Sequence, residues 1–163
     1  MNLLEVRNIC KTYGSGETSV KALKDVSFSV PRGEYVAVVG ESGSGKTQTA
    51  LSILRLLKKQ ERIASGEILF QGKNLAELPL KEMEKIRGKE ISMIFQEPMT
   101  SLNPVLTIGT QIEEGMKLHT KMSAIERKEK ALAIMEEAEL HDPETLWKQY
   151  PHQLSGGMRQ RVM

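Results

Sequence analysis

A glycine-rich segment in the first third of the chain carries the residues best suited to phosphate chemistry. Gly40, Gly45, Lys46 and Thr47 follow the spacing G-x-x-x-x-G-K-[ST]. Glycines let the backbone fold tightly, so that its N–H groups converge on phosphate oxygens. A lysine at this position can reach the β- and γ-phosphates of a nucleoside triphosphate, and a threonine hydroxyl can ligate Mg²⁺. The alternative is a chance glycine-rich turn.

The residues on either side of this segment favour the phosphate-binding interpretation. Tyr35–Val39 (YVAVV) is a continuous apolar run that predicts a buried core strand. Residues 50–57 place apolar side chains at helical spacing, and Lys58 and Lys59 are expected in the last turn of that helix. A helix that begins directly after the glycines adds unsatisfied N–H donors and a partial positive charge.

Two alternating segments come before the core strand. Apolar and polar residues alternate through Leu4–Ile9 and Val26–Val30, which predicts half-buried strands. Together with the continuous run that follows, they predict an antiparallel sheet beside a buried parallel core. Further short strands are expected at Glu67–Gln71 and Ile91–Phe95, and a helix from Pro79 to Gly88.

The second half of the chain is predicted to be helical. Residues 97–104 contain two prolines and read as a loop, whereas Thr107–Leu140 has a helical pattern. Ser123 and Glu126 form a capping-box pair, and Asp142 before a proline predicts a second helix start. We therefore expect a helical subdomain over residues 97–153, followed by the sequence LSGGMRQR.

Composition bounds the class of protein. The length of 163 residues suits one domain with a subdomain. The net charge of +2, from 23 basic and 21 acidic residues, shows none of the excess of basic residues expected of a nucleic-acid-binding protein. A single cysteine, Cys10, excludes an internal disulfide. No apolar run approaches the roughly 20 residues of a membrane span, and the N-terminus lacks a signal-peptide core. These features predict a cytosolic chain whose link to a membrane comes through a partner.

Four features together resemble the nucleotide-binding domain of ABC transporters. They are Tyr13, the glycine-rich segment, Gln96 at a strand end, and LSGGMRQR after a helical insertion. The sequence FQEPMTSLNP at 95–104 is more particularly similar to ATP-binding subunits of dipeptide, oligopeptide and nickel importers. The resemblance implies an α/β P-loop NTPase core, a parallel sheet with flanking antiparallel strands, plus an inserted α-helical subdomain. It divides the chain into 1–96, 97–153 and 154–163.

The resemblance also implies roles for individual residues. Tyr13 would stack on adenine, although a surface tyrosine filling a groove is the alternative. Lys46 and Gln96 would take part in catalysis, and Thr47 and Gln96 would contact Mg²⁺; a polar strand cap is the alternative for Gln96. The residues expected to hold ATP are Tyr13, Gly40, Ser42, Gly43, Ser44, Gly45, Lys46, Thr47, Gln48, Ser155, Gly156 and Gly157.

The same resemblance implies partners. Ser155–Gly157 would cap the γ-phosphate of ATP held by a second copy in a head-to-tail dimer, although a plain N-capping serine fits equally well. Glu97–Pro104 would face membrane permease subunits. The subunit would then lie peripherally on the inner face of the cell membrane, without direct insertion and without nucleic acid. Met158 stands where the broad family often has glutamine, which we do not interpret as loss of function.

In the family, the helix that begins in the LSGG sequence is followed by an aspartate at a strand end, then a glutamate, and later a histidine. The sequence reaches Met163 before these positions, and none of Glu97, Asp142 or Glu144 follows an apolar strand in the right order. We therefore expect an N-terminal piece of a subunit, truncated before that strand, that binds nucleotide but hydrolyses ATP poorly or not at all. Bare apolar surface and self-association are expected too.

Other functions compete with an importer ATPase. The chain could be a non-hydrolytic nucleotide-binding or interaction module, or a soluble ABC-type ATPase acting on nucleic acid or the ribosome. The balanced charge and the FQEPMTSLNP sequence argue against the soluble ATPase. A P-loop kinase or GTPase would not explain the LSGG sequence.

Overall fold

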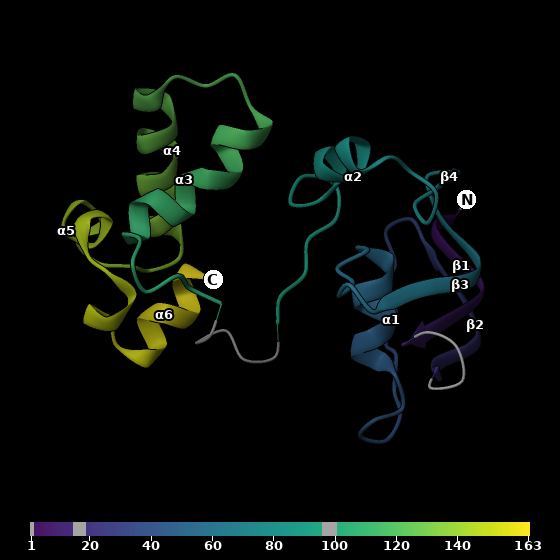
Figure 1. Ribbon diagram of the computed structural model, residues 1–163. Coiled ribbons are helices and arrows are strands. Elements are labelled where there is room, and N and C mark those ends of the chain that lie inside the picture. Colours follow the sequence, from purple (N-terminus) through teal and green to yellow (C-terminus); the bar gives the residue numbers. More distant parts are fainter. Residues whose placement is uncertain (1, 15–18, 96–100) are drawn as a thin grey trace. The chain divides into compact units, whose positions relative to one another are not determined.

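The chain folds as two compact units, Met1–Arg87 (unit 1) and Gly88–Met163 (unit 2). The computed structural model describes residues 2–14, 19–95 and 101–163 (Figure 1). The expected divisions of the chain at 96/97 and 153/154 remain predictions.

Unit 1 is built on an antiparallel sheet with strand order β2-β1-β3-β4. The strands are β1 (Asn2–Tyr13), β2 (Val20–Pro31), β3 (Glu61–Phe70) and β4 (Lys73–Asn74). The alternating segments predicted as strands are confirmed within β1 and β2, which extend beyond the predicted bounds. The strand predicted at Glu67–Gln71 is confirmed within β3, which begins earlier, at Glu61, and ends at Phe70.

The inward residues of β1 and β3 are covered, as at Val6, Ile9 and Ile68. Val6 and Ile9 are three residues apart, and both face inward because the pairing register of β1 shifts between them, where Asn8 has a φ of 48°.

The predicted core strand Tyr35–Val39 is wrong for the described residues. The segment has no strand structure, and the side chain of Val39 is 87% exposed. The strand predicted at Ile91–Phe95 is wrong as well, because only Ile91 makes an isolated bridge. A parallel core strand needs hydrogen-bonding neighbours on both sides, and no described strand lies beside either segment. An apolar sequence predicts that a segment prefers burial, but it does not show that neighbouring strands are available to pair with it.

The helix after the glycines, α1 (Lys46–Ile53), ends earlier than predicted. Its end is a Schellman motif, in which Arg55 takes a positive φ of 50°. The N–H of Leu56 donates to the oxygen of Leu51 at 2.9 Å, and the N–H of Arg55 donates to Ser52 at 3.0 Å. The expectation that Lys58 and Lys59 form the last helical turn was therefore wrong.

Two arginine side chains fix this helix end. Arg87 donates to the main-chain oxygens of Leu54 at 2.7 Å and Arg55 at 2.9 Å. The Arg55 side chain in turn donates to the main-chain oxygens of Leu75 and Leu78. Carbonyl oxygens left free at a helix end need such hydrogen-bond donors. These bonds join the end of α1 to the segments around Leu75–Leu78 and Arg87, which are distant from it in sequence.

The helix expected at Pro79–Gly88 is confirmed as α2 (Leu80–Ile86). Pro79 stands just before the helix as its N-cap residue, and Gly88 follows its end with a φ of 76°. Met83 faces inward and is completely buried.

A buried ion pair joins β1 to β3. Lys11 Nζ lies 2.8 Å from Glu61 Oε2, and the two side chains are only 0% and 5% exposed. The hydrogen bond from Lys11 lowers the pKa of the Glu61 carboxyl below its usual value, although burial acts in the opposite direction. A buried charge is tolerated only when it is paired and hydrogen-bonded, which both groups are.

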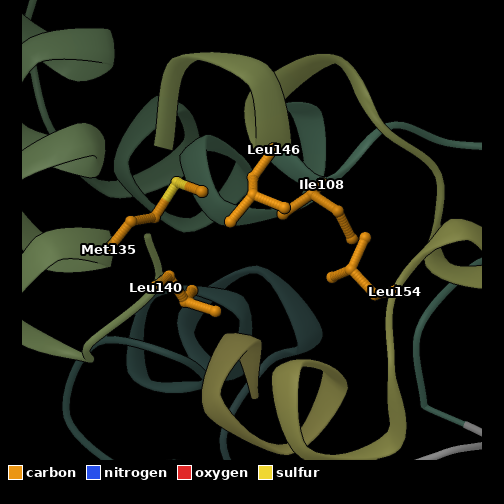
Figure 2. Close-up of a cluster of buried hydrophobic side chains, with 5 residues drawn as sticks. All are labelled: Ile108, Met135, Leu140, Leu146 and Leu154. Carbon is orange, nitrogen blue, oxygen red and sulfur yellow. The ribbon is translucent and has the colours of Figure 1, made fainter. Parts of the chain in front are cut away.

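Unit 2 is helical, as the sequence predicted. Its elements are α3 (Ile108–His119), α4 (Ala124–Glu137), α5 (Pro143–Lys148), the 3-10 helix η3 (Pro151–Gln153) and α6 (Gly156–Val162). One cluster of apolar side chains from several of these elements forms its core (Figure 2): Ile108, Met135, Leu140, Leu146 and Leu154.

Side-chain caps mark the helix starts of unit 2. Ser123 and Glu126 form the predicted capping box, with Glu126 accepting from the Ser123 N–H at 2.7 Å. That bond lowers the pKa of the Glu126 carboxyl. Asp142 caps α5 by accepting from Thr145, as predicted. Thr107 caps α3 in the same way.

Close packing also shapes unit 2. A Cβ placed on Gly109 would lie 2.1 Å from Trp147 Cδ2, so the indole packs directly on the backbone of α3. Gly115, on the same helix, has nothing within 4 Å of the same position.

We predict opposite effects for alanine at these two glycines. Gly109→Ala should destabilise unit 2 by about 1–3 kcal/mol, because the indole must move out of a packed position. Gly115→Ala should stabilise it by about 0.5–1 kcal/mol, because alanine favours an open helical position. Urea unfolding followed by the fluorescence of the single tryptophan, Trp147, measures both. Equal effects of the two substitutions would contradict the packing described.

A second prediction concerns acid. The folded pKa of Glu61 is depressed, so its pairing contributes stability above the unfolded pKa of about 4.3 and loses it as pH falls through the folded value. Glu61→Gln should therefore be less stable than the parent at pH 7, and the gap should narrow as the pH is lowered below about 4. Urea unfolding followed by circular dichroism checks this. The control is Glu67→Gln, which removes an exposed carboxylate from the same strand; a gap for Glu61→Gln that stays constant with pH would refute the assignment.

Candidate functional site

The glycine-rich loop ends at Gly45, which is the N-cap residue of α1. Gly45 has φ 98° and ψ 5°, a left-handed conformation that favours glycine. A Cβ there would come within 2.8 Å of Leu23 Cδ2, so the loop lies directly against β2. Both conformation and space therefore require glycine at this position.

The first turn of α1 is open to an anion. No side chain caps it, and it contains no acidic residue. Its N–H groups and the positive end of the helix therefore remain available to a negatively charged group. Thr47 in this turn is exposed, so its hydroxyl is accessible to a metal ion bound with that group.

Lys46 folds back across the loop. Its Nζ donates to the main-chain oxygens of Gly40 at 2.8 Å and Glu41 at 2.9 Å. A Cβ on Gly40 would lie 2.7 Å from Ser44 Oγ, so the loop also closes on itself. The result is a compact ring of backbone with an ammonium group held over it, an arrangement suited to phosphate oxygens.

Tyr13 and Gln48 meet at the same buried cation. Lys11 Nζ donates to Gln48 Oε1 at 2.5 Å and lies 5.2 Å from the centroid of the Tyr13 ring. Partial burial raises the pKa of the Tyr13 phenol, and the Glu61 carboxylate adds to the effect. The residue expected to stack on a base and one expected near the phosphates are thus joined through one side chain.

Lys11 and Glu61 were missed in the sequence reading. A signal was present, because Lys11 stands two residues before Tyr13, and alternate residues of a strand share one face. A lysine on the same face as buried Ile9 needs a buried partner. Glu61, 50 positions further on, could not be assigned without the pairing of β1 with β3.

Gln96 and residues 97–100 lie outside the described residues, so the predicted roles of Gln96 and of much of the 97–104 loop stay predictions. The described end of that loop is held by Gln111. Its side chain accepts from the Asn103 N–H at 2.8 Å and donates to the oxygens of Asn103 and Leu106 at 3.0 Å. Val105 is left 76% exposed.

The signature segment Ser155–Gly157 opens α6 in unit 2. Ser155 Oγ accepts from the Met158 N–H at 3.3 Å, which makes it an N-cap. Gly156 and Gly157 are exposed, and a Cβ on either would meet nothing within 4 Å. The segment presents an unobstructed backbone surface.

Neither a metal-binding cluster nor a membrane-spanning helix is present in the part of the chain that the structure describes. No group of three or more His, Cys, Asp or Glu side chains is arranged to hold a metal ion. None of the described helices combines the length and the apolarity that crossing a membrane requires.

Curated relatives match almost the whole chain. A probable peptide ABC transporter ATP-binding protein of Sinorhizobium fredii is 51% identical over 163 residues, covering 99% of this chain and 48% of the relative. A dipeptide transport ATP-binding protein of Lactococcus lactis is 46% identical, with 99% and 46% covered. An oligopeptide transport ATP-binding protein of Bacillus subtilis is 48% identical, with 99% and 45% covered. The chain spans about half the length of these relatives.

Solved structures agree with this match. The dimeric ABC transporter cassette MJ0796 superposes with a TM-score of 0.80 at 34% identity, over 98% of this chain and 66% of that one. A post-hydrolysis form of the same cassette, bound to ADP and Pi, gives a TM-score of 0.78. The P-loop NTPase fold class predicted from the sequence is thereby confirmed. The ABC transporter family profile matches residues 23–163, and the chain belongs to that family.

Proposed function

We propose that this chain is the ATP-binding part of a subunit that drives peptide import through a membrane permease. The observation that carries the proposal is the glycine-rich loop, where an uncapped α1 N-terminus and the Lys46 ammonium converge. The peptide, dipeptide and oligopeptide transport names of the relatives support peptide as the solute. No relative named above mentions nickel, which remains an alternative solute.

Each part of the site has a task in binding. The N–H groups of the loop and of the first turn of α1 hold phosphate oxygens, and Lys46 neutralises their charge. Thr47 would supply a hydroxyl ligand to Mg²⁺, which would offset the negative charge of the phosphates. Tyr13 stacks on adenine, an apolar contact that any base can make.

Two segments of the chain are proposed to contact partners, Ser155–Gly157 and the 97–104 loop. A second copy would place its Ser155–Gly157 on the nucleotide held by the first, and the exposed signature backbone together with the dimeric solved cassette supports this. The permease would contact the 97–104 loop, beside which Val105 is exposed. A subunit bound in this way lies at the cytoplasmic face of the membrane.

Hydrolysis makes a further demand, because a group must orient the attacking water. The Glu61 carboxylate, beside Tyr13 in the sheet, is paired with the buried Lys11. The expected aspartate, glutamate and histidine have no counterparts among the 163 residues. We infer that this polypeptide, assayed by itself, binds ATP but turns it over poorly. A non-hydrolytic module would give the same assay result and is distinguished by its failure to activate a permease.

We predict that the chain binds a fluorescent ATP analogue with Mg²⁺ and that Lys46→Ala weakens this binding about tenfold or more, since a charge-assisted contact to phosphate is lost. Titration of fluorescence measures the affinity, and phosphate release measures turnover. Lys24→Ala, which removes an exposed lysine of β2, is the control. Steady ATP turnover that survives Lys46→Ala would contradict the proposal.

A further inference from the structure

The buried ammonium of Lys11 contacts groups on three elements of unit 1, namely β1, β3 and α1. Lys11 is completely buried, and its ammonium contacts the Glu61 carboxylate, the Gln48 amide oxygen and the ring of Tyr13. Its charge is already compensated by Glu61 at 2.8 Å. Gln48 accepts from a further N–H of this ammonium, which has three such donors, and both Gln48 and Tyr13 belong to the candidate nucleotide site.

The topology explains how these groups meet. Lys11 and Tyr13 are alternate residues of β1, and Glu61 is the register partner of Tyr13 on β3. Gln48 follows Thr47 in the first turn of α1. Lys11 thus connects the end of the sheet that carries the aromatic ring with the helix that carries the phosphate donors.

The hydrogen bond to Gln48 has a directional consequence. An ammonium group donates and cannot accept, so it selects the carbonyl oxygen of the glutamine amide. The amide cannot flip without losing this bond. Its two Nε2 protons are then the donors that Gln48 offers beside Thr47, and they suit an anion.

The contact with Tyr13 has an orienting consequence. A cation near the ring of an aromatic residue is attracted to its π electrons, and the attraction strengthens when the cation is removed from water. Lys11 is fully buried, so this attraction helps to hold the phenol in one orientation at the end of β1.

We propose that Lys11 is a positioning residue for nucleotide binding, which orients the Tyr13 ring for the base and the Gln48 amide for the phosphates through one buried ammonium. The proposal rests on the proposed function, because it assumes that ATP occupies the glycine-rich loop. It adds that the base-side and phosphate-side contacts are coupled through Lys11.

The test uses the double variant Lys11→Met with Glu61→Gln in the 163-residue chain. Removing both charges avoids leaving an unpaired buried ion, which would unfold the unit for an unrelated reason. The control is Arg7→Met with Glu67→Gln, because Arg7 and Glu67 form an exposed pair across the same two strands, at 3.5 Å. Affinities for Mg-ATP and for Mg-bound inorganic triphosphate, which lacks the base, are measured by titration, and folding is checked by circular dichroism.

We expect the Lys11/Glu61 variant to lose about tenfold in affinity for Mg-ATP and about threefold or less for inorganic triphosphate, since only ATP uses the Tyr13 ring. The control pair should change neither. An unchanged ATP affinity in the folded variant would overturn the proposal, and so would equal losses for both ligands, which a general loosening of unit 1 explains. If the parent chain binds neither ligand, the proposed function fails and the inference fails with it.

Discussion

The two-sided pairing of β1 is the constraint on which unit 1 depends. Along its length β1 is hydrogen-bonded to β2 on one side and to β3 on the other, so that Leu4 pairs with both Val30 and Phe70. A strand paired on both sides has its backbone groups satisfied and its position fixed. The candidate site depends on this arrangement, because β1 carries the aromatic ring at its end and β2 supports the glycine-rich loop through Leu23.

Features set by neighbouring residues could be predicted from the sequence. The capping box at Ser123 and Glu126 and the cap at Asp142 involve groups a few residues apart, and the structure has both. The glycine-rich loop followed by α1 is equally local. Contacts set by distant pairing could not be predicted in this way. The Lys11–Glu61 pair depends on the register of β1 against β3, which neither segment specifies alone.

The segment Tyr35–Val39 illustrates a different limit. Its apolar run describes what those side chains prefer, namely burial, and that preference led to the prediction of a core strand, which was wrong. A strand, however, is a property of at least two segments, since its backbone groups must find partners. Among the described strands none pairs with it, and the valines are exposed. Helices satisfy their own backbone, which explains why predictions in unit 2 were more successful.

The two ends of α1 are held very differently, and this has a consequence for movement. At its C-terminal end, the Arg55 side chain ties the helix to the segment that leads into α2, and the hydrogen bonds of Arg87 tie it to the residue after α2. At its N-terminal end there is no side-chain cap, and the preceding residues are glycine-rich. The helix is therefore fixed by side-chain hydrogen bonds at its C-terminal end, whereas no side chain caps its N-terminal end. The six residues from Gly40 to Gly45 can therefore adjust to an arriving ligand while the C-terminal end of the helix stays fixed by Arg55 and Arg87.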